Sequence, residues 1–539
     1  MGQLDGGQIV IRSLKDHGVS HLFSLGGGHI NPTWWEAERA GLRRIDVRHE
    51  AAALYAAEGW ALATGELGVG MVTAGPGVTN ALTGLATAYH DGVPVLCLAG
   101  AATTRGEDTG EVESLEQLEL VRPVTKWARR VHHLERLPEQ LAVAITEARS
   151  GRPGPTYLEV PIDLIHSSVD EEALSWPEPR RPLVPPTMPP PELIERAAQA
   201  IASAERPAVV AGSGVWWSGA GAELRALVER AGLPLVTRRA ARGLLPDDHP
   251  LCFGQHWASV VYQADVLLVV GTQLDYFFGY GRFPHLRQLV QLDIHPGELG
   301  RNGAPVTVPL LGDAGATLAA LTEALDPLDT KAWVAALSAQ AEARALGRAE
   351  LAAADRVPIH PLRVCAEIEA VAGREANVVT DGSNMLMWTD VGLGAYEPGR
   401  HASLGPLGTI GHGAGLALGM ACARPDGPTV WAVGDGSFGF HCMELDTAAR
   451  HGLPVTAVIF NNGGWSAAWI PLGERHYERM APAFDGVGEC VERPDQLRPA
   501  LERAIGSGGP AIVNVFVDPA PPYFAGRRFR WEEDMPTPS

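Results

Sequence analysis

An acid and an amide, each beside glycine, stand 27 residues apart near the C-terminal end of the chain, as Asp435 and Asn462. The stretch that holds them reads VGDGSFGFHCMELDTAARHGLPVTAVIFNNGGW. Their side-chain oxygens, with a backbone carbonyl near Gly464, suit the octahedral oxygen shell that Mg²⁺ demands, and phosphate oxygens and a water would complete it. The pattern therefore favours a metal-bound diphosphate. The alternative is a pair of turns that merely use Gly and Asn.

The residues between this pair predict the elements that would position it. An apolar run ends at Val433, residues 443–450 have a helical pattern, and the β-branched run 455–460 predicts a strand. A strand–helix–strand unit of this kind belongs to an open parallel sheet, which binds ligands at the carboxyl ends of its strands. Glycine beside both polar residues leaves the backbone uncovered for a ligand.

A second candidate is Glu50, which follows His49 and precedes three alanines. It would begin a closely packed helix, and burial there would raise the pKa of its carboxyl so that it holds a proton at neutral pH. The alternative is a surface glutamate in a first helical turn, where the helix dipole favours it.

Two glycine-containing turns offer further polar groups. His29 follows three glycines in LFSLGGGHINP, where backbone can approach a ligand and an imidazole can move a proton. The alternative is a structural or surface histidine. The turn Asp381-Gly382-Ser383-Asn384 follows a predicted strand, so that its amides can hold diphosphate, unless it is an ordinary left-handed turn.

Composition narrows the classes of function. The chain has 539 residues, of which 46% are hydrophobic and 20% charged, and its formal net charge is −20. The chain therefore lacks the excess of positive charge that binds nucleic acid, and it has little attraction to an anionic membrane. Six cysteines without CxxC spacing predict reduced thiols in the core. Without a signal pattern or a long apolar span, we expect a cytoplasmic protein.

Two segments divide the chain into blocks. The proline-rich stretch 176–192 predicts an extended linker, and the polar, Ala-rich region 331–356 predicts a helical boundary. Apolar strand patterns alternate with Ala/Leu/Glu-rich helical patterns in every block. We therefore expect an α/β fold of three consecutive parallel-sheet sandwich domains, at residues 1–175, 190–330 and 355–520, with a C-terminal tail at 521–539.

With these motifs the chain resembles the thiamine-diphosphate enzymes of the acetolactate synthase and pyruvate decarboxylase superfamily. GDG followed after 25–27 residues by NN is that family's metal and diphosphate motif. Three further stretches resemble the family: IDVRHEAAALYAAEGWALATG, TAGPGVTNALTGLATAYHDGVPVLCLAG and LGPLGTIGHGAGLALG. The resemblance covers about residues 3 to 520 and implies pyrimidine-binding, central and diphosphate-binding domains in that order.

The resemblance also implies roles for individual residues. Glu50 would bond the pyrimidine nitrogen of thiamine diphosphate, Gly408 would offer its carbonyl to the exocyclic amine, and Ile410 would bend the cofactor. The other implied contacts to the cofactor are Gly75, Asn80, Asp381, Gly382, Ser383, Asn384, Gly434, Gly436 and Ser437, and the implied Mg²⁺ ligands are Asp435, Asn462 and Gly464. In the family, Glu50 of one subunit serves the cofactor of its neighbour, which implies a homodimer or a homotetramer.

The segment around His29, and VRPVTKWARRV at 121–131, resemble benzaldehyde lyase and the 2-hydroxyacyl-CoA lyases. Where relatives usually carry an active-site glutamine, this chain has Glu113, whose charge would repel an α-carboxylate. We therefore expect a carbon–carbon lyase or carboligase for a 2-hydroxyacyl-CoA or a 2-hydroxyketone, with Glu50, His29 and Glu113 as catalytic residues.

Several residues are candidates for substrate or nucleotide contacts. Trp465 and Trp469 would share a helical face that lines the substrate mouth or simply packs, and Tyr276 would floor a channel. Arginines of the tail, Arg527, Arg528 and Arg530, would close over a CoA thioester, as in the 2-hydroxyacyl-CoA lyases, or lie in an exposed tail. Asp293 would meet the ribose of ADP or FAD, unless that site is vestigial.

Two other functions compete with this one. The first is a 2-oxo-acid carboligase or decarboxylase of the acetolactate synthase type. The second is a non-catalytic relative that binds cofactor and serves as a regulatory or assembly subunit. The intact residues Glu50, Asp435 and Asn462 favour a catalyst over that second alternative.

Overall fold

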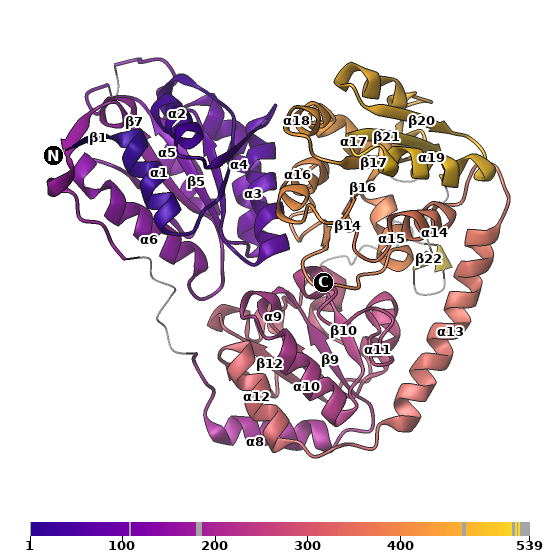
Figure 1. Ribbon diagram of the computed structural model, residues 1–539. Helices are drawn as coiled ribbons and strands as arrows, with labels where there is room; N and C mark the ends of the chain where they lie inside the picture. The colour runs from indigo at the N-terminus through magenta and orange to yellow at the C-terminus, as the bar shows by residue number, and fades with distance from the viewer. Residues whose placement is uncertain are drawn as a thin grey trace. The chain divides into compact units, whose positions relative to one another are not determined.

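Strands and helices alternate along the chain, and the strands of the described residues form three sheets of five or six strands and three small two-stranded sheets (Figure 1). This computed structural model describes residues 2–106, 109–178, 186–465 and 470–519, with the backbone of 523–524 and 527–528. The chain forms two compact units. The first comprises Met1–Val184, Leu404–Thr429 and Gly439–Val455, and the second comprises Pro185–Ser403, Val430–Phe438 and Thr456–Ser539.

The first unit contains a six-stranded sheet in the order β3-β2-β4-β5-β7-β6, with parallel pairing throughout. Its helices form two layers: α1 contacts α2 and α6, while α3 and α4 contact each other and β4 and β5. The bounds are α1 (Gly6–Asp16), β2 (His21–Ser24), α2 (Asn31–Arg39), β3 (Arg43–Asp46), α3 (Glu50–Thr64), β4 (Gly68–Val72), α4 (Pro76–Asp91), β5 (Val95–Ala101), β6 (Trp127–Arg130), α6 (Leu137–Arg149) and β7 (Thr156–Pro161).

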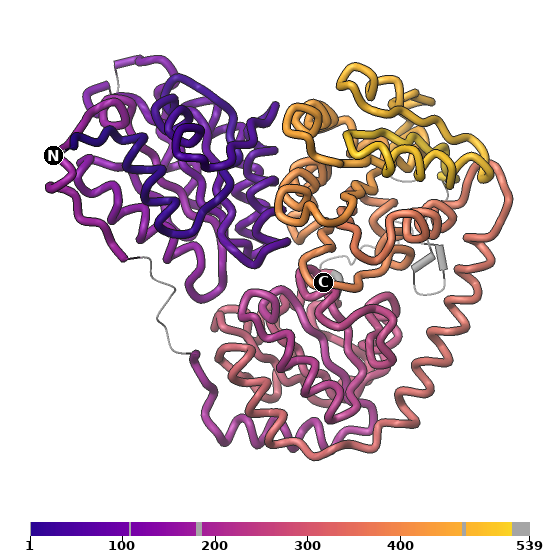
Figure 2. The backbone as a smooth tube through the Cα atoms, in the orientation of Figure 1, coloured from indigo at the N-terminus to yellow at the C-terminus, as the bar shows by residue number. Residues whose placement is uncertain are grey.

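Helix α3 is buried along nearly its whole length because it is packed between the sheet and α16 (Gly413–Ala423). Figures 1 and 2 show these two helices side by side, although they are far apart in sequence. Small residues allow the close approach. A Cβ on Gly419 would lie 2.0 Å from the carbonyl oxygen of Ala56, and one on Gly59 would lie 2.4 Å from that of Leu416. An alanine-rich helix, apolar on nearly all sides apart from the buried Glu58, suits such a position.

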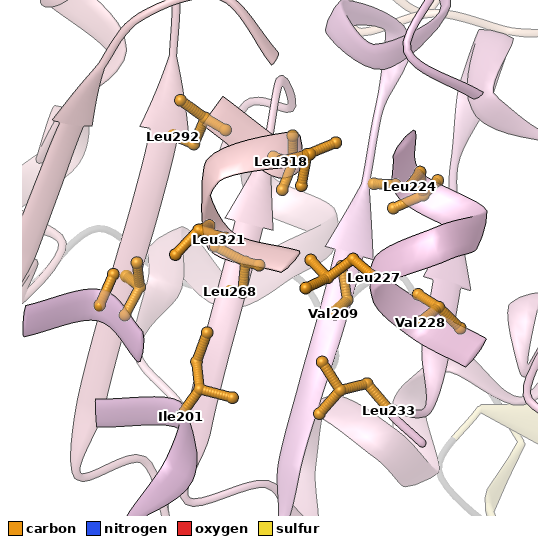
Figure 3. Packing of buried hydrophobic residues seen from close by; sticks show 14 of the residues in the cluster. Ile201, Val209, Leu224, Leu227, Val228, Leu233, Leu268, Leu292, Leu318 and Leu321 are labelled. Atoms are coloured by element: carbon orange, nitrogen blue, oxygen red, sulfur yellow. The ribbon is translucent and has the colours of Figure 1, made fainter. Parts of the chain in front are cut away.

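The central sheet of the second unit has the order β10-β9-β11-β12-β13 and is buried on both faces. Along β11 the side chains alternate: Leu268 and Val270 join one core cluster, while Leu267 and Val269 join the other. Figure 3 shows the first cluster, where Leu268 lies near side chains of the covering helices. The strands are β9 (Pro207–Ala211), β10 (Leu235–Thr237), β11 (Val266–Val270), β12 (Gln288–Asp293) and β13 (Val308–Leu311).

The other sheet of the second unit has the order β15-β14-β16-β17-β21-β20. Helices α14 (Pro361–Ala372), α15 (Asn384–Gly392) and α19 (Pro494–Gly506) share a hydrophobic core with its strands. The strands are β14 (Asn377–Asp381), β15 (His401–Ser403), β16 (Thr429–Gly434), β17 (Val455–Asn461), β20 (Val487–Val491) and β21 (Ala511–Phe516).

Most of the predicted elements are confirmed. The parallel α/β architecture is present, and the predicted strand, helix and strand around Asp435 correspond to β16, α18 (Glu444–His451) and β17. The chain also forms a short helix that was not predicted, α17 (Asp435–His441). The Ala-rich region forms α13 (Lys331–Ala353). All six cysteines are free, and four of them are buried.

The predicted helical face at Trp465 and Trp469 is wrong. Residues Gly464–Trp465 form the short strand β18, which pairs antiparallel with β19 (Ile470–Pro471), so the chain reverses direction here. Trp469 lies outside the described residues. Among the helices that the structure describes, none combines the length and the apolarity needed to cross a bilayer.

Candidate functional site

Three polar turns follow neighbouring strands of the second unit. Strand β14 ends at Asp381, β16 ends at Gly434, and Asn462 follows β17; these three strands are adjacent in the sheet. The first two turns lie against each other. A Cβ on Gly382, where φ is 119°, would lie 3.4 Å from the amide nitrogen of Gly434 and 3.5 Å from the hydroxyl of Ser437. The topology thus gathers the residues of the predicted diphosphate motif at one edge of the sheet.

Asp435 is buried at this edge, with 3% of its surface exposed. Burial raises the pKa of its carboxyl to about 6, while hydrogen bonds from the backbone of Gly436, Gly464 and Gly463 act in the opposite direction. Those bonds place Asp435 against the turn after β17. In that turn, the Asn462 side-chain oxygen accepts from the amide of Gly464 at 3.2 Å. The acid and the amide of the motif therefore both bond the backbone of Gly464.

Two buried polar atoms at this edge fit the predicted ligands. Oδ2 of Asp435 and Nδ2 of Asn384 have no hydrogen-bond partner among the residues that the structure describes. A buried carboxylate oxygen without a donor is costly and is stabilised by a cation, while a buried amide N–H₂ is satisfied by a phosphate oxygen. Oxygen donors are also the ligands that Mg²⁺ prefers. These residues therefore fit a diphosphate held by Mg²⁺.

Trp465 packs directly on this edge. A Cβ on Gly436 would lie 2.9 Å from the Trp465 ring, so glycine is required for the indole to approach the Asp435 turn. Trp465 therefore makes a packing contact, which was one of its two expected roles. The contact places the ring beside the diphosphate motif.

In the first unit, Glu50 is the first residue of α3 and is 7% exposed. The Nδ1 atom of His49, the N-cap residue, accepts from the Ala51 amide at 3.1 Å and so fixes the start of the helix. One carboxyl oxygen of Glu50 accepts from the Asn80 side-chain amide at 2.9 Å. The structure therefore brings together two of the predicted cofactor contacts, Glu50 and Asn80, from α3 and α4.

Glu444 holds the backbone that precedes Glu50, and sequence reasoning missed it. It is 2% exposed, and its two carboxyl oxygens accept from the Arg48 amide at 3.0 and 3.2 Å. The Thr447 hydroxyl donates to it at 2.7 Å. Burial raises the pKa of Glu444 to about 7. The signal available in the sequence was an acid in the first turn of the helix predicted at 443–450.

The loop before α16 carries Gly408 and Ile410. Gly408 is exposed in a left-handed conformation with φ of 70°, and Ile410 is half-buried. Between them, the hydroxyl of Thr409 lies 3.0 Å from that of Thr87 on α4, which fixes the loop to the first unit. Gly408, Ile410, Glu50 and Asn80 thus all belong to that unit.

His29 and Glu113 form a cluster with Thr73. Nδ1 of His29 lies 2.9 Å from a carboxyl oxygen of Glu113, and the Thr73 hydroxyl donates to the same oxygen at 2.8 Å. His29 is buried, and a Cβ on Gly100 would lie 2.3 Å from its Cβ, so glycine makes room for the imidazole. Glu113 has a left-handed backbone with φ of 62°. Thr73 was not predicted, although it directly follows the apolar residues of β4.

Gly75 packs closely against the backbone of Glu113 in this cluster. Its φ is 53°, and a Cβ there would lie 2.8 Å from the carbonyl oxygen of Glu113. Its amide donates to the buried side chain of Gln117 at 2.7 Å, and Gln117 in turn donates to Glu159 at 2.8 Å. Gln117 was also missed by sequence reasoning, because its role depends on contacts with distant strands.

The remaining predicted residues lie elsewhere in the fold. Tyr276 begins the 3₁₀ segment Tyr276–Gly281 after β11, and Asp293 ends β12, where its carboxylate accepts from the His295 amide at 2.8 Å. The backbone of Arg527 and Arg528 pairs with that of Tyr523–Phe524 in a two-stranded ribbon. The side chains of these arginines, and Arg530 as a whole, lie outside the described residues.

Comparison with known proteins agrees with this arrangement. Three models of the thiamine pyrophosphate enzymes match the chain: the N-terminal TPP binding domain at residues 4–120, the central domain at 194–321 and the C-terminal TPP binding domain at 381–515. A probable acetolactate synthase of Mycobacterium bovis is 36% identical over 537 residues, covering 96% of this chain and 97% of that protein.

Two other relatives carry different names. The oxalyl-CoA decarboxylase of Escherichia coli is 32% identical over 542 residues, covering 96% of this chain and 95% of that protein. The 2-hydroxyacyl-CoA lyase 1 of Homo sapiens is 29% identical over 556 residues, covering 96% and 95%. The chain therefore belongs to the thiamine pyrophosphate (thiamine diphosphate) enzyme family.

Proposed function

We propose that this chain is a Mg²⁺-dependent carbon–carbon lyase and carboligase that acts on a neutral 2-hydroxyketone or a 2-hydroxyacyl thioester. The observation that carries the proposal is the cluster of His29, Glu113 and Thr73, in which His29 and Thr73 are buried and Glu113 is partly exposed. The bound thiamine cofactor would supply a carbanion that adds to a carbonyl carbon and stabilises the charge left when the neighbouring bond breaks. The substrate and the proton transfers depend on the residues of the chain.

Glu50 would hold the proton that activates the cofactor. Its carboxyl is buried at the start of α3 with Asn80 on one oxygen, which leaves the other oxygen to face a ligand nitrogen. A carboxyl fixed in this way can donate to or accept from a ring nitrogen without reorganising. In the second unit, Asp435, Asn462 and the Gly464 carbonyl would hold Mg²⁺, while the turns at 381–384 and 434–437 would hold diphosphate through their amides.

His29 would exchange a proton with the substrate hydroxyl. The carboxylate of Glu113 accepts from Nδ1–H of His29, which leaves Nε2 as the ring nitrogen that can accept a proton. Thr73 keeps the carboxylate in place. The same carboxylate also disfavours a substrate that carries its own carboxylate, because two like charges at short range repel. Neutral hydroxyketones and thioesters avoid this repulsion.

The alternative function is a 2-oxo-acid carboligase or decarboxylase of the acetolactate synthase type. It is favoured by the relative in Mycobacterium bovis, which is a probable acetolactate synthase and 36% identical over most of both chains. On this alternative, pyruvate would be accepted in spite of the Glu113 carboxylate.

A substrate panel distinguishes the two functions. Purified protein with thiamine diphosphate and Mg²⁺ is offered formaldehyde, acetone or benzaldehyde together with acyl-CoA or hydroxyketone partners, and separately pyruvate. We expect cleavage or formation of a hydroxyketone or of a 2-hydroxyacyl-CoA, with little CO₂ release from pyruvate. Rapid CO₂ release from pyruvate with no activity on the neutral compounds would replace this proposal with the alternative.

Matched variants test the cluster itself. His29→Ala should lower kcat by about 10²–10⁴-fold, the usual contribution of a positioned acid–base group. Glu113→Gln should cost less, because the amide oxygen can still accept from Nδ1, and it should improve the relative rate with carboxylate substrates. The exposed residue His132 provides the control His132→Ala, which should leave both quantities unchanged.

The assembly and the domain limits are part of the same proposal. We assign residues 1–175, 190–330 and 355–520 to pyrimidine-binding, central and diphosphate-binding domains, and we propose a homodimer or a homotetramer. The family models that match at 4–120, 194–321 and 381–515 support the assignment. Light scattering of the purified protein tests the assembly: a monomer at micromolar concentration with full activity would contradict it.

A further inference from the structure

Three side chains of the kinds that bind transition metals meet in the second unit, separate from the predicted Mg²⁺ ligands. They are His476, Glu478 and Cys490, and their ligand atoms all lie within 4.8 Å of one another. Nδ1 of His476 is 3.0 Å from a carboxyl oxygen of Glu478, and Sγ of Cys490 is 3.9 Å from the same Nδ1. Glu478 lies in the 3₁₀ segment Tyr477–Phe484, and Cys490 in β20.

These distances are close to those of a tetrahedral metal site. Zn²⁺ binds nitrogen and carboxylate oxygen at about 2.0–2.2 Å and sulfur at about 2.3 Å, so neighbouring ligand atoms of a tetrahedron lie roughly 3.3–3.7 Å apart. The nitrogen and oxygen need to separate slightly. The sulfur, 3.9 Å from the nitrogen and within 4.8 Å of the carboxylate, needs to approach both. Rotation of the partly exposed His476 and Cys490 side chains can provide both movements.

The carboxylate ligand is already fixed by a second layer of hydrogen bonds. The other carboxyl oxygen of Glu478 accepts from the amide of Asn514 at 2.9 Å, and the side-chain oxygen of Asn514 accepts from the amide of Asn461 at 3.1 Å. The His476 ring makes an edge contact with Phe516, at 5.9 Å between centroids. Partners of this kind orient metal ligands and contribute to affinity.

The chemistry of the three groups suits a borderline metal better than Mg²⁺. An imidazole, a carboxylate and a thiol supply nitrogen, oxygen and sulfur, whereas Mg²⁺ prefers oxygen alone. Burial first, and then the carboxylates of Glu478 and Glu492, raise the pKa of the Cys490 thiol. A divalent cation would offset those negative charges and displace the thiol proton. The charged group of Arg479 lies 3.7 Å from Glu478 but is largely exposed and free to turn away.

We propose that His476, Glu478 and Cys490 bind one divalent transition-metal ion of the Zn²⁺ class, with water as the fourth ligand. Binding converts the Cys490 thiol to a metal-bound thiolate and releases one proton to solvent. The ion is a structural one. Through Glu478 and Asn514 it fixes Asn461, the last residue of β17 and the neighbour of Asn462. The proposal does not depend on the substrate or on the proposed function.

The test uses Co²⁺ as a probe on the full-length protein after chelator treatment, in the presence of excess Mg²⁺. We expect one equivalent of Co²⁺ to bind, with a thiolate-to-cobalt charge-transfer band and the visible bands of a tetrahedral ion, and with release of about one proton. Zn²⁺ should displace the cobalt and abolish the spectrum, while Mg²⁺ should not.

Variants identify the ligands. Cys490→Ser should abolish the charge-transfer band, and His476→Ala should weaken cobalt binding by at least about 10-fold, as even the loss of an outer-layer partner does. Cys442→Ser is the matched control, since Cys442 is the other partly exposed cysteine, and it should leave the spectrum unchanged. Circular dichroism checks that each variant is folded.

Two results would overturn the proposal. One is the lack of any charge-transfer band when the wild-type protein is mixed with stoichiometric Co²⁺ under reducing conditions. The other is a band that persists in Cys490→Ser but disappears in Cys442→Ser, which would place the metal on a different thiol. Either result would leave His476 and Glu478 as a simple hydrogen-bonded pair.

Discussion

The region around Glu50 and the region around Asp435 each contain a buried acid, and the two acids differ in how their carboxyl oxygens are paired. Glu50 is the first residue of an alanine-rich helix that is buried on nearly all sides, and Asn80 from the neighbouring helix donates to its carboxyl. Asp435 lies between two glycines as the first residue of the short helix α17, and one of its oxygens has no partner among the described residues. In the first region, protein groups alone fix the position of the acid. In the second region, as far as the structure describes the chain, the buried oxygen of Asp435 is free for a ligand to bind.

The same contrast extends to the neighbouring acids. Glu444 is buried beside Glu50, but its oxygens accept from backbone and hydroxyl groups of the protein. Burial raises the pKa of both Glu444 and Asp435, to about 7 and about 6. We therefore expect protonation to change the stability of the fold in the first region and the binding of a cation in the second.

The largest effect is expected from Glu50→Gln. An amide cannot transfer the proton, so kcat should fall by about 10²–10⁴-fold, while thermal stability changes little because Asn80 can still bond the side-chain oxygen. Steady-state turnover and exchange of the cofactor C2 proton, followed by NMR, measure the effect. Glu66→Gln, at an exposed acid after the same helix, is the control. Unchanged turnover would remove Glu50 from the mechanism.

The next effect concerns Glu444 and pH. Its pKa in the fold is about 7, above its ordinary value of 4.5, so the folded state binds the proton more tightly than the unfolded state. The resulting stability is fully present below pH 4.5 and is lost as the pH rises through 7, by up to about 3.5 kcal/mol at 1.4 kcal/mol per unit.

Glu444→Gln removes this titration. The stability of the variant relative to the wild type, from thermal or denaturant unfolding, should rise steadily between about pH 4.5 and 7 and be constant above that range. Glu474→Gln, at an exposed glutamate, should follow the wild-type curve at every pH. Parallel curves for Glu444→Gln and the wild type would show that Glu444 does not titrate in this window.

A third prediction concerns Asp435 and ligand binding. Thiamine diphosphate with Mg²⁺ at about 100 times its Kd should stabilise the wild type by about 2.7 kcal/mol. Asp435→Ala should lose this stabilisation, because the cation loses its charged ligand. Differential scanning calorimetry with and without ligand measures it, and Asp495→Ala at an exposed aspartate of the same unit is the control. An equal ligand-induced shift in Asp435→Ala would contradict the assignment.

The smallest effect is the pH dependence of Mg²⁺ binding. Because the pKa of Asp435 is raised to about 6, a proton competes with the cation below that pH. The apparent affinity for Mg²⁺ should be constant above about pH 7 and fall by up to about tenfold per unit below about pH 6. Isothermal titration of the wild type measures this slope. Asp435→Asn should bind Mg²⁺ more weakly, and its affinity should not depend on pH in this range. A wild-type affinity that stays constant below pH 6 would contradict the prediction.

Sequence reasoning succeeded where local patterns carry the information. The alternation of apolar and β-branched runs predicted β16 and β17, and glycine beside Asp435 and Asn462 marked the turns after them. It failed at Trp465, which lies in the short strand β18 paired with β19 and not in a helix. A segment of only one helical turn has too few residues for its spacing to distinguish a helix from a strand or a turn, so tertiary contacts decide its structure.

The sequence by itself determined the parallel α/β architecture, the family and the polar residues at the strand ends, because strand and helix periodicity and motif spacing are local properties of the chain. The tertiary structure alone decided which distant groups meet. It brought Thr73 to the carboxylate of Glu113, Glu444 to the backbone before Glu50, and Cys490 to His476. Such contacts depend on packing and on strand order, which residue spacing along the chain does not encode.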